Sequence, residues 1–357
     1  MKIRAAVLAL VVVLAASACT GDSASGDAEQ SAAEPPGASA TQPPPEQSSA
    51  DPAAPTQDPD SVDAQFGPRP GIRSGPLEAA TVAELDALFS SLTTAIDPET
   101  IIRLGESEDV RLAWIIGDIL RFTSSGSAVD VLSEALVTIT GSELDGTALR
   151  PGVVYRQLTD RLIAWDVPAP PGYAAYKEQL FTLVEPGWAP FFADTEGEID
   201  WRWIIWGGVF IDDREFGDPN GCSGGCIAAL DDPAVTGAEE GNWYPDDALV
   251  CGLEIDGETR AFPKNIMEVH EVVNDTLGGR RFGMPYCTLC GSAQAYLTDE
   301  LTNDLVLRTS GLLSRSNKVM YDFTTKSVFD TFTGRALTGP LREQGVQLEE
   351  LTVVTAT

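Results

Sequence analysis

The chain has 357 residues, of which 54 are Asp or Glu and only 23 are Lys or Arg, so its formal net charge at pH 7 is −31. A surface with this charge repels polyanions and therefore disfavours nucleic acid and anionic lipid headgroups as partners. The length allows two folded domains as well as unfolded segments.

The first residues predict export. Two basic residues precede an apolar run at residues 5–16, which is too short to span a bilayer and has the length of a signal-peptide core. The run leads into the sequence ASAC, which resembles the lipobox of bacterial lipoproteins, although Ala16 stands where leucine is usual. We predict a signal peptide at residues 1–18 and a lipid on Cys19 that anchors the chain outside the cytoplasm to the cell membrane. The alternative is cleavage after Ala18 without a lipid.

Residues 19–75 are predicted to be a disordered tether. Between positions 20 and 68 there are nine prolines and nine Asp or Glu residues, with no Lys or Arg, and the first aromatic residue is Phe66. Such a segment buries too little apolar surface to offset the entropy lost on ordering. Its prolines and like charges keep it extended.

Residues 76–215 are predicted to form an all-α, solenoid-like domain. Apolar residues recur at helical spacing in TVAELDALFSSL, DVRLAWIIGDILRF, SAVDVLSEALVTI, RQLTDRLIAW and AAYKEQLFTLV. A helical domain of this kind could bind a protein partner. Near its end, Trp201, Trp203 and Trp206 form an aromatic cluster that we interpret as filling the seam with the next domain, and alternatively as a platform for a carbohydrate or a membrane surface.

Residues 216–357 are predicted to be mainly β, with one short helix, so the fold class is α+β. Asp256-Gly257 between two β-rich runs is a hairpin signal, and further strands are expected at 281–284, 293–297, 305–309, 318–323 and 327–331. The helix is expected at 264–274.

Common enzymatic motifs are absent from the sequence: it has no G-x-S-x-G elbow, no P-loop and no G-x-G-x-x-G. Residues 270–274 read HEVVN and lack the second histidine of the zinc motif H-E-x-x-H. Because His270 is the single histidine of the chain, a multi-histidine metal site is excluded. His270 could still be one metal ligand, a proton shuttle or a partner of a thiol; otherwise it is a structural hydrogen-bonding residue.

Five cysteines follow Cys19, and an odd number cannot all pair within one chain. Cys222 and Cys226 lie in the glycine-rich loop NGCSGGC, where we predict a structural disulfide. Cys251, on a predicted strand, is expected to be a buried free thiol.

The remaining two cysteines, Cys287 and Cys290, form a C-x-x-C pair in PYCTLCGSA. A redox pair of the usual kind requires its first cysteine at a helix N-terminus, where the pKa of the thiol is lowered. A metal knuckle needs further ligands, which only Cys222 and Cys226, or Cys251 with His270, could supply. A purely structural C-x-x-C disulfide closes a small, strained ring.

Several segments together resemble one protein family. The motifs GLEIDGETRAFP, EVHEVVNDTLGG, PYCTLCGSAQAY and TSGLLSRSNKVMYDFTTKSVFDTFTGRALTGPL occur in an order similar to that of the bacterial and archaeal family catalogued as domain of unknown function 3179, over roughly residues 220–351. The family pattern usually has proline inside the cysteine pair, where this chain has Thr288. It also usually continues past the end of this sequence, so the alternatives are a missing final strand and a chain that is a fragment.

The resemblance implies no known reaction, but it singles out residues. It shares His270 and the two cysteines with the chemical argument, and it adds a set of motif residues: Asn274, Asp275, Gly291, Ser310, Gly311, Tyr321 and Asp322. For most of these a plain structural role is the simpler interpretation, with Asn274-Asp275 suited to a turn.

Three hypotheses follow for the function. In the first, Cys287, Cys290 and His270 bind a soft or borderline metal, copper or zinc, because thiolates and an imidazole suit both ions. In the second, the cysteine pair is the redox centre of an extracytoplasmic thiol–disulfide oxidoreductase. In the third, the protein is a non-catalytic surface module whose helical domain binds a partner.

Overall fold

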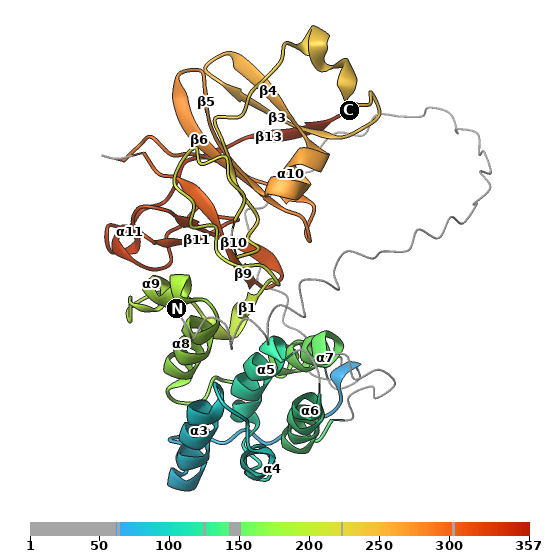
Figure 1. Cartoon of the computed structure of the whole chain (residues 1–357), viewed down its shortest axis with the longest axis vertical. Coiled ribbons are helices and arrows are strands. Elements are labelled where there is room, and N and C mark those ends of the chain that lie inside the picture. The colour runs from blue at the N-terminus through green and yellow to red at the C-terminus, as the bar shows by residue number, and fades with distance from the viewer. Residues whose placement is uncertain (1–61, 63–64, 124–125, 143–150, 223, 302–303) are drawn as a thin grey trace, which may run out of the picture.

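The computed structural model describes residue 62 and residues 65–123, 126–142, 151–222, 224–301 and 304–357. Its N-terminal half is helical and its C-terminal half consists mainly of sheets, so the predicted α+β class is confirmed (Figure 1). The predicted signal peptide and Cys19 lie outside the described residues. Within the described residues, no helix is long and apolar enough to cross a membrane.

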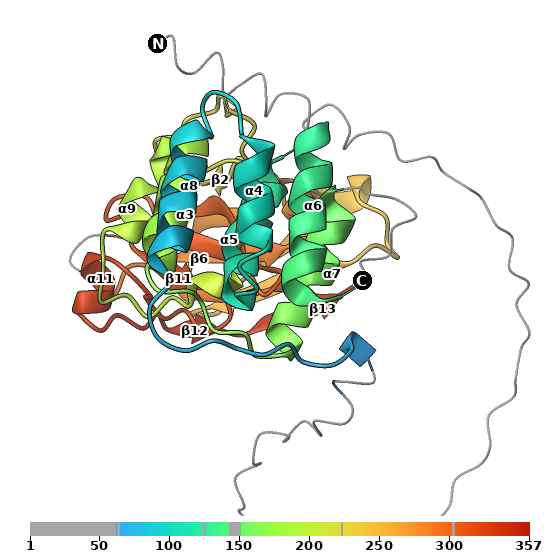
Figure 2. The ribbon, with the colours of Figure 1, turned by 90° about the horizontal axis from the view of Figure 1, so that it is seen from below.

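The helical half begins with α3 (Ala79–Ser91) and α4 (Pro98–Gly105) and is centred on α5 (Ala113–Phe122). The remaining longer helices are α6 (Ser127–Thr140), α7 (Pro151–Ala164) and α8 (Tyr173–Val184), followed by the short α9 (Ala189–Phe192). Figure 2 shows the long helices side by side over one side of the β half. Every residue of α5 except Arg121 is buried, because α6, α7 and α8 pack around it.

A charged group lies inside this helical core. The Asp118 carboxylate accepts hydrogen bonds from Lys177 Nζ at 3.0 Å and from the Tyr173 hydroxyl at 2.7 Å, and all three side chains are buried. Burial raises the pKa of Asp118 and lowers that of Lys177, against their mutual attraction. Because all its members are buried, we interpret this group as a structural ion pair.

The last part of the predicted tether is ordered, which corrects its boundary. Phe66 and Ile72 pack against the helical core. Gly67 O accepts a hydrogen bond from Trp165 Nε1 at 3.1 Å, and Gly75 O accepts one from Arg111 at 2.8 Å. The buried side chains of Trp165, directly after α7, and of Arg111, before α5, therefore hold a segment whose own composition favours disorder.

The β half contains three sheets. A four-stranded sheet has the order β1-β9-β10-β11 and consists of β1 (Ile204–Trp206), β9 (Leu307–Ser314), β10 (Asn317–Asp322) and β11 (Val328–Asp330). A second sheet has the order β12-β8-β6-β5-β2, with β7 beside β6; its strands are β2 (Leu230–Asp231), β5 (Val272–Leu277), β6 (Arg280–Cys287), β7 (Ser292–Ala293), β8 (Ala295–Leu297) and β12 (Glu350–Leu351). The third, β13-β3-β4, is formed by β3 (Val250–Ile255), β4 (Glu258–Pro263) and β13 (Val353–Ala356).

The two halves share one hydrophobic core. β1 comes directly after the helices and pairs with β9, and the helical core includes Leu312 and Tyr321 of the β half. Trp206 is buried and stacks on Phe122 of α5 with ring centroids 5.1 Å apart. Of the tryptophan cluster, Trp206 therefore fills the seam between the halves, whereas Trp201 and Trp203 are only partly buried.

One predicted element differs in the structure. The helix α10 (Lys264–His270) ends four residues before the predicted position, because Glu271 adopts a left-handed conformation with φ of 57°. The β-branched pair Val272-Val273 then begins β5. As a result, Asn274 and Asp275 lie on a strand and not in the expected turn. The short α11 (Pro340–Glu343) is the other α-helix of this half.

Candidate functional site

The C-x-x-C pair occupies a tight turn at the end of β6. Cys287 is the last residue of β6, and its carbonyl accepts hydrogen bonds from Cys290 N at 3.1 Å and Gly291 N at 2.8 Å. Gly291 has φ of 63°, a left-handed conformation that favours glycine, which explains the glycine of the motif. The chain then returns as β7, so neither cysteine lies at a helix N-terminus.

The two thiols differ in exposure but face the same oxygen. Cys287 is 1% exposed, whereas Cys290 is exposed, and both are free thiols. Their Sγ atoms lie 3.9 Å and 3.4 Å, respectively, from the Ser316 carbonyl oxygen, and Cys290 Sγ also lies 3.6 Å from Asn317 Oδ1. The Cys290 thiol also has a side-chain hydrogen bond with Cys287, so the two sulfurs are neighbours.

A strained turn presents this carbonyl. Arg315 and Ser316, between β9 and β10, have φ of 48° and 69°, which is rare for residues other than glycine. The Arg315 guanidinium lies 3.7 Å from the ring centroid of Trp203, and Arg315 N donates to Trp203 O. The helical half therefore holds the turn that contacts the dithiol.

A buried lysine lies beside the pair. Lys318 Nζ donates to Glu271 O at 2.9 Å and lies 3.1 Å from Glu271 Oε2, and its side chain is 4% exposed. Burial lowers the pKa of Lys318 to about 8, although the negative charges of Glu271 and Cys287 oppose this change. The ammonium is therefore within electrostatic reach of Cys287.

The second thiol proton is held strongly. Although Cys290 is exposed as a residue, its sulfur faces Ser316 and is partly desolvated. This desolvation, followed by the hydrogen bond and the charge of Cys287, raises the pKa of Cys290 to about 12. Cys290 therefore keeps its proton near neutral pH.

His270 does not join the two cysteines. Its Nδ1 atom lies 2.8 Å from Ala228 O, so the ring connects the end of α10 to the segment after Cys226. Among the described residues, the ligand atoms of His270, Cys287 and Cys290 do not gather within 4.8 Å; the residues that do so are Asp212, Cys222 and Cys226. The third ligand expected for the predicted metal site is thus placed elsewhere, because α10 ends at His270 and directs its ring toward residue 228.

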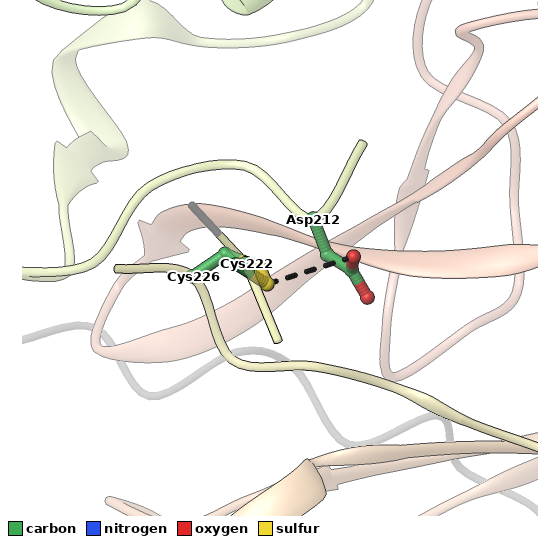
Figure 3. Close-up of side chains that lie close together, drawn as sticks. All are labelled: Asp212, Cys222 and Cys226. Carbon is green, nitrogen blue, oxygen red and sulfur yellow. Dashed lines mark hydrogen bonds between the residues drawn. A yellow bond between two sulfur atoms is a disulfide. The ribbon is translucent and has the colours of Figure 1, made fainter. Parts of the chain in front are cut away.

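Cys222 and Cys226 lie at disulfide-bonding distance, as predicted, with Cα atoms 5.3 Å apart. Figure 3 shows Cys222 Sγ beside Asp212 Oδ1, at 3.8 Å. Both oxygens of Asp212 are already engaged by Arg214, at 2.8 and 3.0 Å, and Oδ2 also accepts from Ala229 N. With its sulfurs joined and its carboxylate paired, this group offers a metal no free ligand.

A buried ion-pair network surrounds Asp212. Arg308 makes two hydrogen bonds of 2.7 Å to Asp231, and both side chains are almost fully buried. The motif residue Asn274 donates to Asp231 Oδ1 and accepts from Leu307 N. Asn274 therefore joins β2, β5 and β9, which is a structural role.

The other motif residues also support the fold. Asp275 pairs with Arg260 of β4, the Tyr321 hydroxyl donates to Asp212 O, and Asp322 accepts from Val306 N and Thr325 N. Ser310 donates to Val319 O across the β9–β10 hairpin. At Gly311, with φ of 76°, a Cβ would lie 2.4 Å from Val209 O, so no larger residue fits.

Sequence reasoning missed three residues at the dithiol, namely Glu271, Ser316 and Lys318. Their spacing from Cys287 gives no signal, because Glu271 lies on an earlier segment and Ser316 and Lys318 lie together on a later one. The only local signal is the lysine of SNKVMYDF, a charged residue at the start of an apolar strand. Cys251, in contrast, is a buried free thiol as predicted, and burial raises its pKa.

Comparison with known proteins agrees with the resemblance found in the sequence. A family model described as "Protein of unknown function (DUF3179)" matches residues 224–357, which contain the dithiol turn, Glu271 and Lys318. The match covers most of the β half of the chain. No curated protein and no solved structure matches the chain.

Proposed function

We propose that the protein is an extracytoplasmic thiol–disulfide oxidoreductase whose redox centre is Cys287–Cys290. The observation that carries this proposal is the pair itself: two free thiols that face one carbonyl oxygen, one buried and one exposed. In this arrangement the sulfurs can bond to each other, and one of them can meet a substrate.

Accessibility assigns the order of events. A substrate disulfide can reach Cys290, whereas Cys287 is covered. Cys290 first gives its proton to solvent, against its raised pKa, and attacks one substrate sulfur. A mixed disulfide forms, and the other substrate sulfur leaves as a thiolate that takes a proton from solvent. Cys287 then gives its own proton to solvent, attacks Cys290 Sγ and releases the first substrate sulfur, which is protonated in turn. The substrate has gained two electrons and two protons, and the chain holds a Cys287–Cys290 disulfide.

Lys318 supports the second step and its reverse. When a substrate thiolate attacks Cys290 of the disulfide, Cys287 is the leaving group, and a nearby ammonium stabilises its negative charge. Better leaving groups accelerate exchange. In redox pairs of the usual kind, a helix N-terminus stabilises the thiolate. In this chain, the ammonium of Lys318 would do so.

The proposed location is consistent with this chemistry. An exported chain, anchored through Cys19, would meet protein dithiols and disulfides outside the cytoplasm, where disulfides persist. The helical half would then serve as a spacer or as a docking surface for a protein partner.

The experiment uses the full chain, exported to an oxidising compartment and purified without chelators. We expect alkylation and peptide mapping to find a Cys287–Cys290 disulfide that dithiothreitol reduces. Reduction of a disulfide-bonded peptide should fall to background in Cys290→Ser and remain in the control variant Cys251→Ala. A peptide-reduction rate that Cys290→Ser does not change would contradict the proposal.

The same sample tests the metal hypothesis, which one observation favours: both sulfurs face one side of the turn, as two thiolates holding copper(I) or zinc would. About one metal per chain by elemental mass spectrometry, lost in Cys287→Ser and retained in His270→Ala, would assign the pair to metal binding. A metal-free chain with the disulfide would favour redox chemistry.

A further inference from the structure

The surface around Cys290 carries unusually exposed apolar side chains. Leu289 is 71% exposed and Val269 is 65% exposed, which makes them the most exposed large apolar residues of the described chain. Leu289 directly precedes Cys290. A structural explanation for Leu289 at this position is lacking, because the turn needs no apolar side chain there.

The two residues lie on segments that touch. The Thr288 hydroxyl donates to Glu268 O at 3.1 Å, which joins the cysteine turn to the last turn of α10. Leu289 directly follows Thr288, and Val269 directly follows Glu268, so the two apolar residues lie on segments that this hydrogen bond joins. Together with the exposed thiol they form what we call the Cys290 rim, defined as Val269, Leu289 and Cys290.

The charges limit what can bind this rim. The nearest charged side chains on α10, Lys264 and Glu268, pair with each other and leave no free cation there. The chain as a whole carries a net charge of −31 and therefore repels small thiols that carry carboxylates. An apolar rim on an acidic protein is complementary to a neutral or basic polypeptide with apolar side chains.

We propose that the Cys290 rim is the docking surface for a cysteine-containing polypeptide segment, neutral or basic, with apolar residues beside its disulfide. Such segments are exposed in exported chains that have not finished folding. This inference rests on the proposed redox function and names its substrate class. Leu289 and Val269 bury apolar surface against the segment while its disulfide meets Cys290.

The test compares three oxidised substrates of the reduced full chain: a basic peptide disulfide with leucine beside each cysteine, the same peptide with serine there, and oxidised dithiothreitol. We expect the wild type to prefer the leucine peptide in kcat/KM by about tenfold. The double variant Leu289→Ser/Val269→Ser should lower this ratio to about one. Leu289→Met should keep it, as should Val354→Ser, which alters a 55% exposed valine on β13.

Each outcome has one meaning. Failure of the wild type with all three substrates overturns the redox function, whereas equal rates with both peptides overturn the docking inference alone. If the double variant loses its rate with oxidised dithiothreitol in the same proportion as its rate with the leucine peptide, the rim only stabilises the cysteine turn and the docking inference is overturned. Two further results would also overturn the proposal. If the wild type forms dimers in size-exclusion chromatography and the double variant does not, the rim binds a second copy of the chain. If the wild type binds neutral phosphatidylcholine vesicles and the double variant does not, the rim binds lipid.

Discussion

The two cysteine pairs of this protein stand in contrasting surroundings. Cys222 and Cys226 are joined beside a carboxylate, Asp212, that is fully buried within a network of ion pairs. Cys287 and Cys290 are free thiols in a turn, one buried beside Lys318 and one open to solvent. The first pair is half-buried beside a carboxylate, whereas the second has a buried lysine nearby and one exposed sulfur.

The comparison teaches that cysteine spacing alone does not decide function. Both pairs are separated by only a few residues and both lie in tight loops. A nearby carboxylate disfavours a thiolate, whereas a nearby ammonium favours one. We therefore assign a structural role to the first pair and a chemical role to the second.

The largest effect is expected from breaking the ion pairs around the first pair. Asp231→Ala leaves Arg308 buried without its bidentate partner, which should lower the free energy of unfolding by about 3–5 kcal/mol. Urea unfolding measures this loss. Asp232→Ala is the matched control, since Asp232 is half exposed and pairs with Arg281 at the surface, where a pair contributes about 0–1 kcal/mol. Similar losses for the two variants would show that the network does not anchor this region.

A smaller loss is expected from removing the first disulfide. The double variant Cys222→Ser/Cys226→Ser should lose about 2 kcal/mol of stability, because the loop that it opens is short. Peptide reduction by Cys287–Cys290 should persist. Loss of that activity in a still-folded double variant would mean that the two pairs act together and would remove the contrast between them.

Per pH unit, the smallest effect on stability comes from the charge beside the second pair. Lys318 has a pKa of about 8 in the folded chain and an ordinary value of 10.5, so above pH 8 the folded chain releases this proton before the unfolded chain does. The unfolded state then binds more protons, and the free energy of unfolding should rise with pH between 8 and 10.5, by up to about 1.4 kcal/mol per pH unit.

Cys290 acts in the opposite direction at higher pH. Its pKa is raised from 9.0 to about 12, so the unfolded chain releases this proton first above pH 9 and stability falls there. We therefore compare the free energy of unfolding of the wild type with that of Lys318→Met, measured in urea from pH 7 to 9.5, because both chains contain Cys290 and its contribution cancels. If the difference between the two free energies stays constant over that range, the pKa of Lys318 is not lowered.

Local patterns predicted much of the fold. The helical spacing of apolar residues at 109–122 and 127–139 predicted α5 and α6, and Asp256-Gly257 predicted the β3–β4 hairpin. The β-branched start of β5 was wrongly assigned to the preceding helix, since only the left-handed Glu271 separates the two. Residues 65–75 were assigned to the tether because their partners lie far away in the sequence, at Trp165 and Arg111.

The sequence by itself determined the division into helical and β halves and the proximity of Cys222 to Cys226, since both depend on interactions between residues a few positions apart. Only the tertiary structure decided the surroundings of the second pair. Ser316 O faces Cys287 Sγ, and Lys318, which donates to Glu271 O, feels the charge of Cys287, because segments distant in the chain pack together here. The physical reason is that backbone periodicity is a local property, whereas the charge and solvent access that make a thiol reactive depend on whichever distant segments pack beside it.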